Sequence, residues 1–151
     1  MIIRFLYDII SIGSEYMNNL YDILNLTGNK EDKIKSCIKK VKLELNDLVE
    51  EQTCKIYSSY VSDELYKNHV INRIIRTGDL SSYDHHFVLV PKDGDNYFLI
   101  DLTYSQFKND TFKNLLSDGY IVIKKDELNN YLRIVTSKSL NKEIDDIYFT
   151  K

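Results

Sequence analysis

Two short apolar runs around a turn-forming segment constrain the fold most strongly. The runs are Phe87–Val90 and Tyr97–Ile100, and the residues between them include Asp93 followed by Gly94. β-branched and aromatic residues favour strands, and an Asp-Gly pair between two such runs is a strong short-range signal for a hairpin. The sequence therefore predicts an antiparallel hairpin centred on this pair.

Helical periodicity dominates the chain before this hairpin. Apolar residues recur close to every 3.6 positions over residues 2–26, with an interruption at Gly13, and again over residues 31–50. The remaining predicted elements are a helix opening at Thr53 and Cys54, strands at 70–75 and 120–123, and helices at 110–116 and 126–135. We expect a single α+β domain over residues 1–151, in which a helical amino-terminal part, residues 1–50, precedes an antiparallel sheet.

Composition excludes several classes of protein. Hydrophobic residues make up 43% of the 151 positions, so the chain has the material for a packed core and is not a disordered protein. A net charge of -3 supplies no general basic field for nucleic acid or for an anionic membrane. No apolar run reaches the roughly 20 residues that span a bilayer. The expectation is a protein of the cytoplasm in which it is made, with no nucleic-acid partner and no membrane span.

The hairpin brings a histidine to an aspartate. With a two-residue turn at Asp93 and Gly94, Lys92 opposes Asp95, and counting outward places His86 opposite Asp101. Opposed residues have Cβ atoms about 4.5–5.5 Å apart, near enough for an imidazole to hydrogen-bond a carboxylate. A three-residue loop shifts the pairing and brings His85 into play.

Cys54 supplies a nucleophile to this pair. It stands at a predicted helix start, with Thr53 as the expected N-cap, and both the helix dipole and the free backbone N–H groups of a helix start favour a thiolate. A carboxylate beside a histidine fixes the ring tautomer and stabilises the imidazolium, as a general base requires. The prediction is therefore a triad in which Cys54 is the nucleophile, His86 the base and Asp101 its orienter.

The other cysteine and the remaining histidine favour structural roles. Cys37 lies in the apolar stripe of the 31–50 helix and is expected in the core, and His69 has no carboxylate at a useful spacing and is expected at the surface. A structural reading of Cys54 also stands, because single cysteines are often core residues. The chain order, the helix start and the hairpin register together favour catalysis over that reading.

No pattern indicates a metal or a cofactor. His85 and His86 are adjacent and point to opposite faces of a strand, and the chain has neither Cys-x-x-Cys nor His-Glu-x-x-His spacing. Gly78 and Gly94 are isolated and make no phosphate-binding loop. The expectation is chemistry by side chains alone.

The block from residue 52 to residue 107 resembles a known superfamily. A helix-opening Cys54, His86 at the head of a strand, and the segment Leu99–Phe107, in which Asp101 ends a strand before a threonine and aromatic residues, are similar to papain-like cysteine peptidases. The nearest kinds are bacterial effector cysteine proteases and effector glutamine deamidases. The resemblance implies a papain-like α+β fold, a protein or peptide substrate, the three triad roles given above, and delivery to a host or neighbouring cell as an alternative to the cytoplasm.

Departures from the family's pattern shape the functional prediction. Papain has a glutamine several residues before its cysteine for the oxyanion hole, whereas here Leu48 stands six before Cys54 and Gln52 only two before. Gln52, acting with the Cys54 backbone N–H, is the candidate oxyanion donor. Transglutaminase-like relatives often carry tryptophan two residues after the histidine, where this chain has Val88. The expected function is a cysteine peptidase; the alternatives are a protein glutamine deamidase or acyl transferase on the same triad, and a non-enzymatic interaction protein.

Overall fold

The computed structural model describes residues 29–46, 53–79, 84–107 and 110–136. In these ranges it has three α-helices and a four-stranded antiparallel sheet, which confirms the predicted α+β class. The elements in chain order are α3 Lys30–Glu44, α4 Cys54–Lys67, β1 Arg73–Arg76, η1 Thr77–Asp79, β2 His86–Pro91, β3 Asn96–Ile100, η2 Tyr104–Gln106, β4 Tyr120–Lys124 and α5 Lys125–Thr136. Among these residues, no helix is long and apolar enough to cross a membrane.

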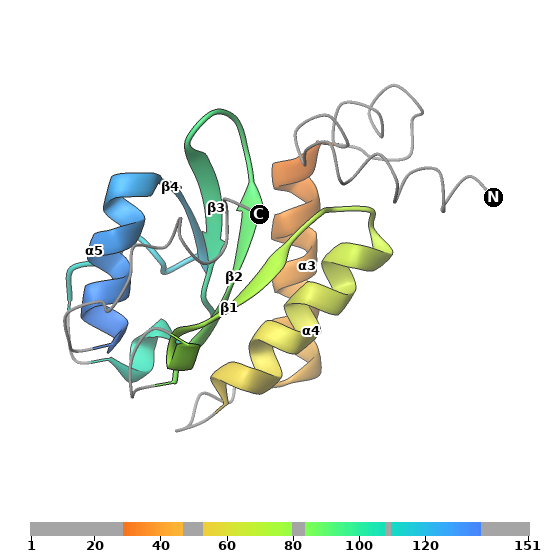
Figure 1. The fold of residues 1–151 in the computed structure, drawn as a ribbon. Helices are drawn as coiled ribbons and strands as arrows, with labels where there is room; N and C mark the ends of the chain where they lie inside the picture. The colour runs from red at the N-terminus through yellow and green to blue at the C-terminus, as the bar shows by residue number, and fades with distance from the viewer. Residues whose placement is uncertain (1–28, 47–52, 80–83, 108–109, 137–151) are drawn as a thin grey trace.

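The sheet forms the middle of three layers. Its strands follow chain order, β1-β2-β3-β4, and every neighbouring pair is antiparallel. Helices α3 and α4 cover one face and α5 covers the other (Figure 1). The helices therefore lie on both sides of the sheet in sequence as well as in space, because α5 follows the last strand.

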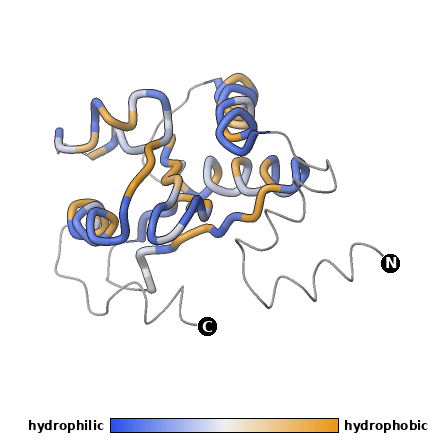
Figure 2. The backbone as a smooth tube through the Cα atoms, turned by 90° about the horizontal axis from the view of Figure 1, so that it is seen from above, coloured by the Kyte–Doolittle hydropathy of each residue, from blue (hydrophilic) through white to orange (hydrophobic). Residues whose placement is uncertain are grey.

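Successive side chains of each strand point to opposite faces of the sheet, so the hydrophobic core has two parts, one on each face. Phe87 and Leu89 of β2 face α5, while Val88 and Val90 face α3 and α4. Because both faces are covered by helices, β2 is a nearly continuous apolar run instead of an alternating one. Figure 2 shows the hydrophobic stretches of the strands lying between the helices.

Most predicted elements are present, with corrected boundaries. The predicted 31–50 helix is α3, which ends at Glu44, and the predicted 126–135 helix is α5. The helical pattern over residues 2–26 lies outside the described residues. The helix predicted at 110–116 is wrong, because residues 111–118 form consecutive turns. Their backbone hydrogen bonds differ in span: Lys113 N donates to Asp110 O, three residues back, and Leu116 N donates to Phe112 O, four residues back.

The predicted hairpin exists, but its predicted register is wrong. Val88 pairs with Ile100 and Leu89 with Leu99, one residue away from the expected pairing. The cause is the length of the loop. The backbone N–H of Lys92 donates to the carbonyl oxygen of Asn96 at 3.1 Å, which leaves three loop residues, 93–95, between them. A one-residue shift moves every side chain of a strand to the other face relative to its partner. His86 is therefore not on the face of Asp101.

Gly119 fixes the chain beside the end of β3. Its φ is +89°, and its carbonyl oxygen accepts the backbone N–H of Asp101 at 3.0 Å. A Cβ added there would lie 2.5 Å from Leu102 Cδ2 and 3.1 Å from Ile38 Cγ2. The positive φ favours glycine at this position, and a larger residue would also have to displace the methyl groups of Leu102 and Ile38.

We expect Gly119→Ala to lower the free energy of unfolding by about 2 kcal/mol or more, from backbone strain together with overpacking. Gly94→Ala is the matched control, because Gly94 also has a positive φ, +49°, but has no atom within 4 Å of an added Cβ. Its cost is expected near 1 kcal/mol. Urea unfolding of the two variants measures the difference, and equal losses would show that the contacts with Leu102 and Ile38 do not matter.

Candidate active site

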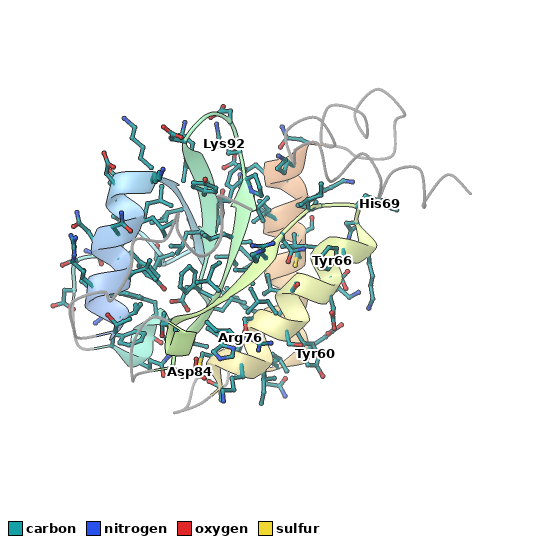
Figure 3. All side chains as sticks on the ribbon, viewed as in Figure 1. Tyr60, Tyr66, His69, Arg76, Asp84 and Lys92 are labelled. Carbon is teal, nitrogen blue, oxygen red and sulfur yellow. The ribbon has the colours of Figure 1, made fainter. Side chains whose placement is uncertain are left out.

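Three elements bring polar side chains together at one end of the sheet. Cys54 is the first residue of α4, His85 immediately precedes β2, and Asp101 immediately follows β3. The residues are 4%, 0% and 3% exposed, respectively. Figure 3 labels Asp84, the neighbour of His85, at this end of the molecule, and Lys92 of the hairpin loop at the other end.

The histidine that meets Asp101 is His85. Its Nε2 lies 2.8 Å from Asp101 Oδ2, and both side chains are only 1% exposed. The main chain holds His85 in place, because its N–H donates to Thr77 Oγ1 at 2.6 Å and its carbonyl accepts the Thr77 N–H at 2.9 Å. The sequence prediction that paired His86 with Asp101 is corrected by this contact.

His86 belongs to a different, more exposed cluster. Its Nε2 lies 3.0 Å from Asp84 Oδ2, and Lys55 Nζ approaches the same carboxylate oxygen at 3.5 Å. The Asp84 side chain is 40% exposed. Adjacent residues of an extended chain point to opposite faces, so His85 and His86 cannot share one partner.

The Asp101 carboxylate is held by four donors. Thr103 donates its backbone N–H and its hydroxyl to Oδ1 at 3.0 and 3.2 Å, and the Tyr131 hydroxyl donates to Oδ2 beside His85 Nε2. Burial alone raises the pKa of a carboxyl group, but His85 and these donors outweigh it and hold the pKa of Asp101 below its ordinary value. Asp101 is therefore ionised at neutral pH.

The ionised Asp101 determines the state of His85. An ionised carboxylate only accepts hydrogen bonds, so His85 Nε2 carries the proton between them and Nδ1 is left for other partners. Burial lowers the pKa of the imidazole, but the charge and hydrogen bond of Asp101, with a further contribution from Cys54, raise it to about 9. The amide Nε2 of Gln106 lies 3.3 Å from Nδ1, and the Phe107 ring meets the imidazole edge-on at 4.8 Å between centroids.

The pKa values of the two cysteine thiols are shifted in opposite directions. Burial opposes ionisation of Cys54, but hydrogen bonds from the His85 side chain and the His86 backbone lower its pKa below the ordinary value. Burial instead raises the pKa of Cys37 to about 12, and its Sγ donates to the Val61 carbonyl at 3.5 Å. Cys37 is 2% exposed among apolar side chains, which confirms the predicted core role.

Of the other residues discussed from the sequence, Thr53 and His69 lie in the described part of the chain and Gln52 does not. Thr53 stands at the N-cap position of α4, but its backbone is helical and its side chain makes no cap hydrogen bond. His69 is exposed, as predicted. Gln52, the candidate oxyanion donor, lies outside the described residues.

Three residues of the site were not predicted from the sequence. Thr103 follows Asp101 by two positions, the spacing at which an aspartate side chain bonds the backbone ahead of it, so a local signal existed. Gln106 reaches both His85 and Thr103 from η2. Tyr131 is 30 residues from Asp101 and reaches it through the packing of α5, for which no local sequence pattern exists.

The assembled side chains match the parts of a thiol-dependent acyl-transfer site. Cys54 offers a sulfur whose pKa the His85 side chain lowers. Asp101 fixes the imidazole through Nε2, which leaves Nδ1 as the nitrogen that can take up a proton. Among the described residues, no group of three histidine, cysteine, aspartate or glutamate side chains is arranged to hold a metal ion.

Comparison of the chain with protein-family models, with curated proteins and with solved structures finds no match.

Proposed function

We propose that this protein is a thiol hydrolase acting on amide carbonyls through Cys54, His85 and Asp101, and that it is a cysteine peptidase of papain-like type. One observation carries the proposal: His85, whose Nε2 is held at 2.8 Å by the buried Asp101 carboxylate, also lowers the pKa of the buried thiol that opens α4. The likeness to papain-like enzymes rests on a nucleophile at a helix start packed against an antiparallel sheet that carries the histidine and the aspartate.

The chemistry follows from the proton positions. His85 Nδ1 takes the proton of Cys54, which gives a thiolate beside an imidazolium that Asp101 stabilises. The sulfur attacks the carbonyl carbon and the imidazolium protonates the leaving amine as the C–N bond breaks. His85 then removes a proton from water, whose oxygen displaces the sulfur from the thioester and releases an acid.

The same steps serve related reactions. A backbone amide as substrate makes the enzyme a peptidase, and a glutamine side chain makes it a deamidase that releases ammonia. An amine in place of water gives an acyl transferase. A site that had only a structural role would not require a lowered pKa at Cys54 while burial raises that of Cys37 to about 12.

Acylation by p-nitrophenyl acetate tests the proposal without knowledge of the natural substrate. We expect release of p-nitrophenol and transfer of one acetyl group to Cys54, seen by intact and peptide mass spectrometry, because this ester needs little help with its leaving group. Cys54→Ser is expected to remove the acetylation, whereas Cys37→Ser is expected to retain it in whatever fraction of the protein remains folded. Acetylation of Cys37 alone, or none in the folded wild type, would contradict the proposal.

Substrate proteins then separate the reactions. Cleavage of an unfolded protein such as reduced casein by the wild type, absent in Cys54→Ser, indicates a peptidase. Release of ammonia without cleavage indicates a glutamine deamidase. A product that forms only when an amine is added indicates an acyl transferase.

A further inference from the structure

Helix α5 sends a tyrosine hydroxyl into the back of the site. Tyr131 is fully buried, and its hydroxyl donates to Asp101 Oδ2, the same oxygen that accepts His85 Nε2. Helix α5 lies on the face of the sheet opposite α4, which carries Cys54 (Figure 1). The proposed triad thus has a fourth member that comes from another layer of the fold.

Packing leaves this hydroxyl little freedom. The Tyr131 ring lies edge-on to Phe87 at 5.1 Å and to Phe112 at 5.4 Å, and stacks on Tyr104 at 5.8 Å, all between ring centroids. Side chains packed this closely stay in one rotamer. The hydroxyl is therefore aimed at Asp101 before any substrate binds.

We propose that Tyr131 is a positioning residue of the triad: its hydroxyl fixes Asp101 Oδ2 so that the carboxylate stays ionised and directed at His85. The inference rests on the proposed function, which it extends to a residue of α5. Thr103 cannot replace Tyr131, because both of its donors bond the other oxygen, Oδ1.

Loss of the Tyr131 hydroxyl is expected to change how well Asp101 stabilises the charged form of His85. In the part of the chain that the structure describes, the titratable side chains that interact with Asp101 are Cys54 from α4, His85 before β2, Tyr104 from η2 and Tyr131 from α5. Removal of the Tyr131 hydroxyl leaves the buried carboxylate with one donor fewer, so Asp101 takes up a proton at a higher pH. The carboxylate is also no longer directed at His85 Nε2, so it stabilises the imidazolium less and the Cys54 thiolate paired with that imidazolium forms only at higher pH.

The experiment compares Tyr131→Phe with Tyr104→Phe. Tyr104 belongs to the same aromatic cluster, and its hydroxyl is paired with the backbone of Phe112. Alkylation of Cys54 by iodoacetamide is followed against pH by peptide mass mapping. In Tyr131→Phe the acid limb is expected to move upward by about half a pH unit, which is about a threefold loss of thiolate below that limb. Tyr104→Phe is expected to keep the wild-type limb.

An acid limb of Tyr131→Phe that stays with the wild type, or moves to lower pH, overturns the inference. If that variant does not fold, the ring carbon bearing the hydroxyl, observed by NMR in wild-type protein with labelled tyrosine, replaces it. The Tyr131 signal is expected to shift over the pH range in which Cys54 titrates, and a signal that stays constant overturns the inference.

Failure of this inference and failure of the proposed function give different results. If wild-type alkylation depends on His85 and Tyr131→Phe changes nothing, Tyr131 has only a packing role and the triad stands. If His85→Ala leaves the alkylation profile of Cys54 unchanged, the triad itself is wrong.

Discussion

His85→Ala is expected to reduce acetylation of Cys54 by p-nitrophenyl acetate by about 10²-fold or more at neutral pH, because a positioned general base typically contributes 10²–10⁴. The alanine removes both the proton acceptor beside the sulfur and the charge that stabilises the thiolate. The rate of p-nitrophenol release, with intact mass as a check on the site, measures the loss.

His86→Ala is the matched control. It is the neighbouring histidine, it has its own carboxylate partner in Asp84, and its contribution to Cys54 comes from the backbone, which alanine retains. We expect its rate within about threefold of wild type, because the side chain that is removed contacts Asp84 and not Asp101. The reverse outcome, loss in His86→Ala with His85→Ala active, would restore the register predicted from the sequence and contradict the site described here.

Asp101→Asn is expected to lower the same rate strongly while keeping the size and shape of the side chain. The two donors of Thr103 hold the oxygen of the new amide at the Oδ1 position, so its NH₂ faces His85 Nε2. An N–H facing Nε2 selects the tautomer with its proton on Nδ1, which cannot accept the proton of Cys54. In a serine triad the equivalent change costs about 10⁴ in rate.

The amide also leaves donors poorly matched at Tyr131, so a loss of about 1–3 kcal/mol in the free energy of unfolding is expected. Asp84→Asn is the control, because it alters the exposed carboxylate that His86 contacts and leaves Asp101 intact. Thermal melts and p-nitrophenol release on both variants provide the measurement. A fully active Asp101→Ala variant, which has no carboxylate and no amide, would contradict the role of Asp101.

The elements of the fold were largely readable from local patterns. The strands of the hairpin, α3, α5 and the start of α4 at Cys54 follow from periodicity and from turn residues. The turns at 111–118 were mistaken for a helix because Phe112 and Leu116 have helical spacing, although they pack into the α5-facing core from consecutive turns. The spacing of apolar residues predicts which side chains lie on one face, but it does not determine whether the backbone between them is a helix or a series of turns.

The histidine that contacts Asp101 was predicted one residue away from where it lies, and the reason for the error is physical. Cys54 and Asp101 depend on where a helix starts and a strand ends, which local sequence sets. The choice between His85 and His86 depends on whether the loop has two residues or three, and an Asp-Gly pair is compatible with both. Tyr131 depends on how α5 docks on the sheet, which is a property of the whole core.

The pH dependence of alkylation of Cys54 and Cys37 in the native wild-type protein tests the central claim most directly. A thiolate paired with His85 exists above the lowered pKa of Cys54, with an imidazolium beside it up to the His85 pKa of about 9. Cys54 is therefore predicted to react with iodoacetamide below the ordinary thiol pKa of about 8.5, while Cys37, with a pKa near 12, stays unmodified. Equal, slow labelling of both cysteines with a single limb at or above the ordinary thiol pKa would contradict the Cys54–His85–Asp101 triad.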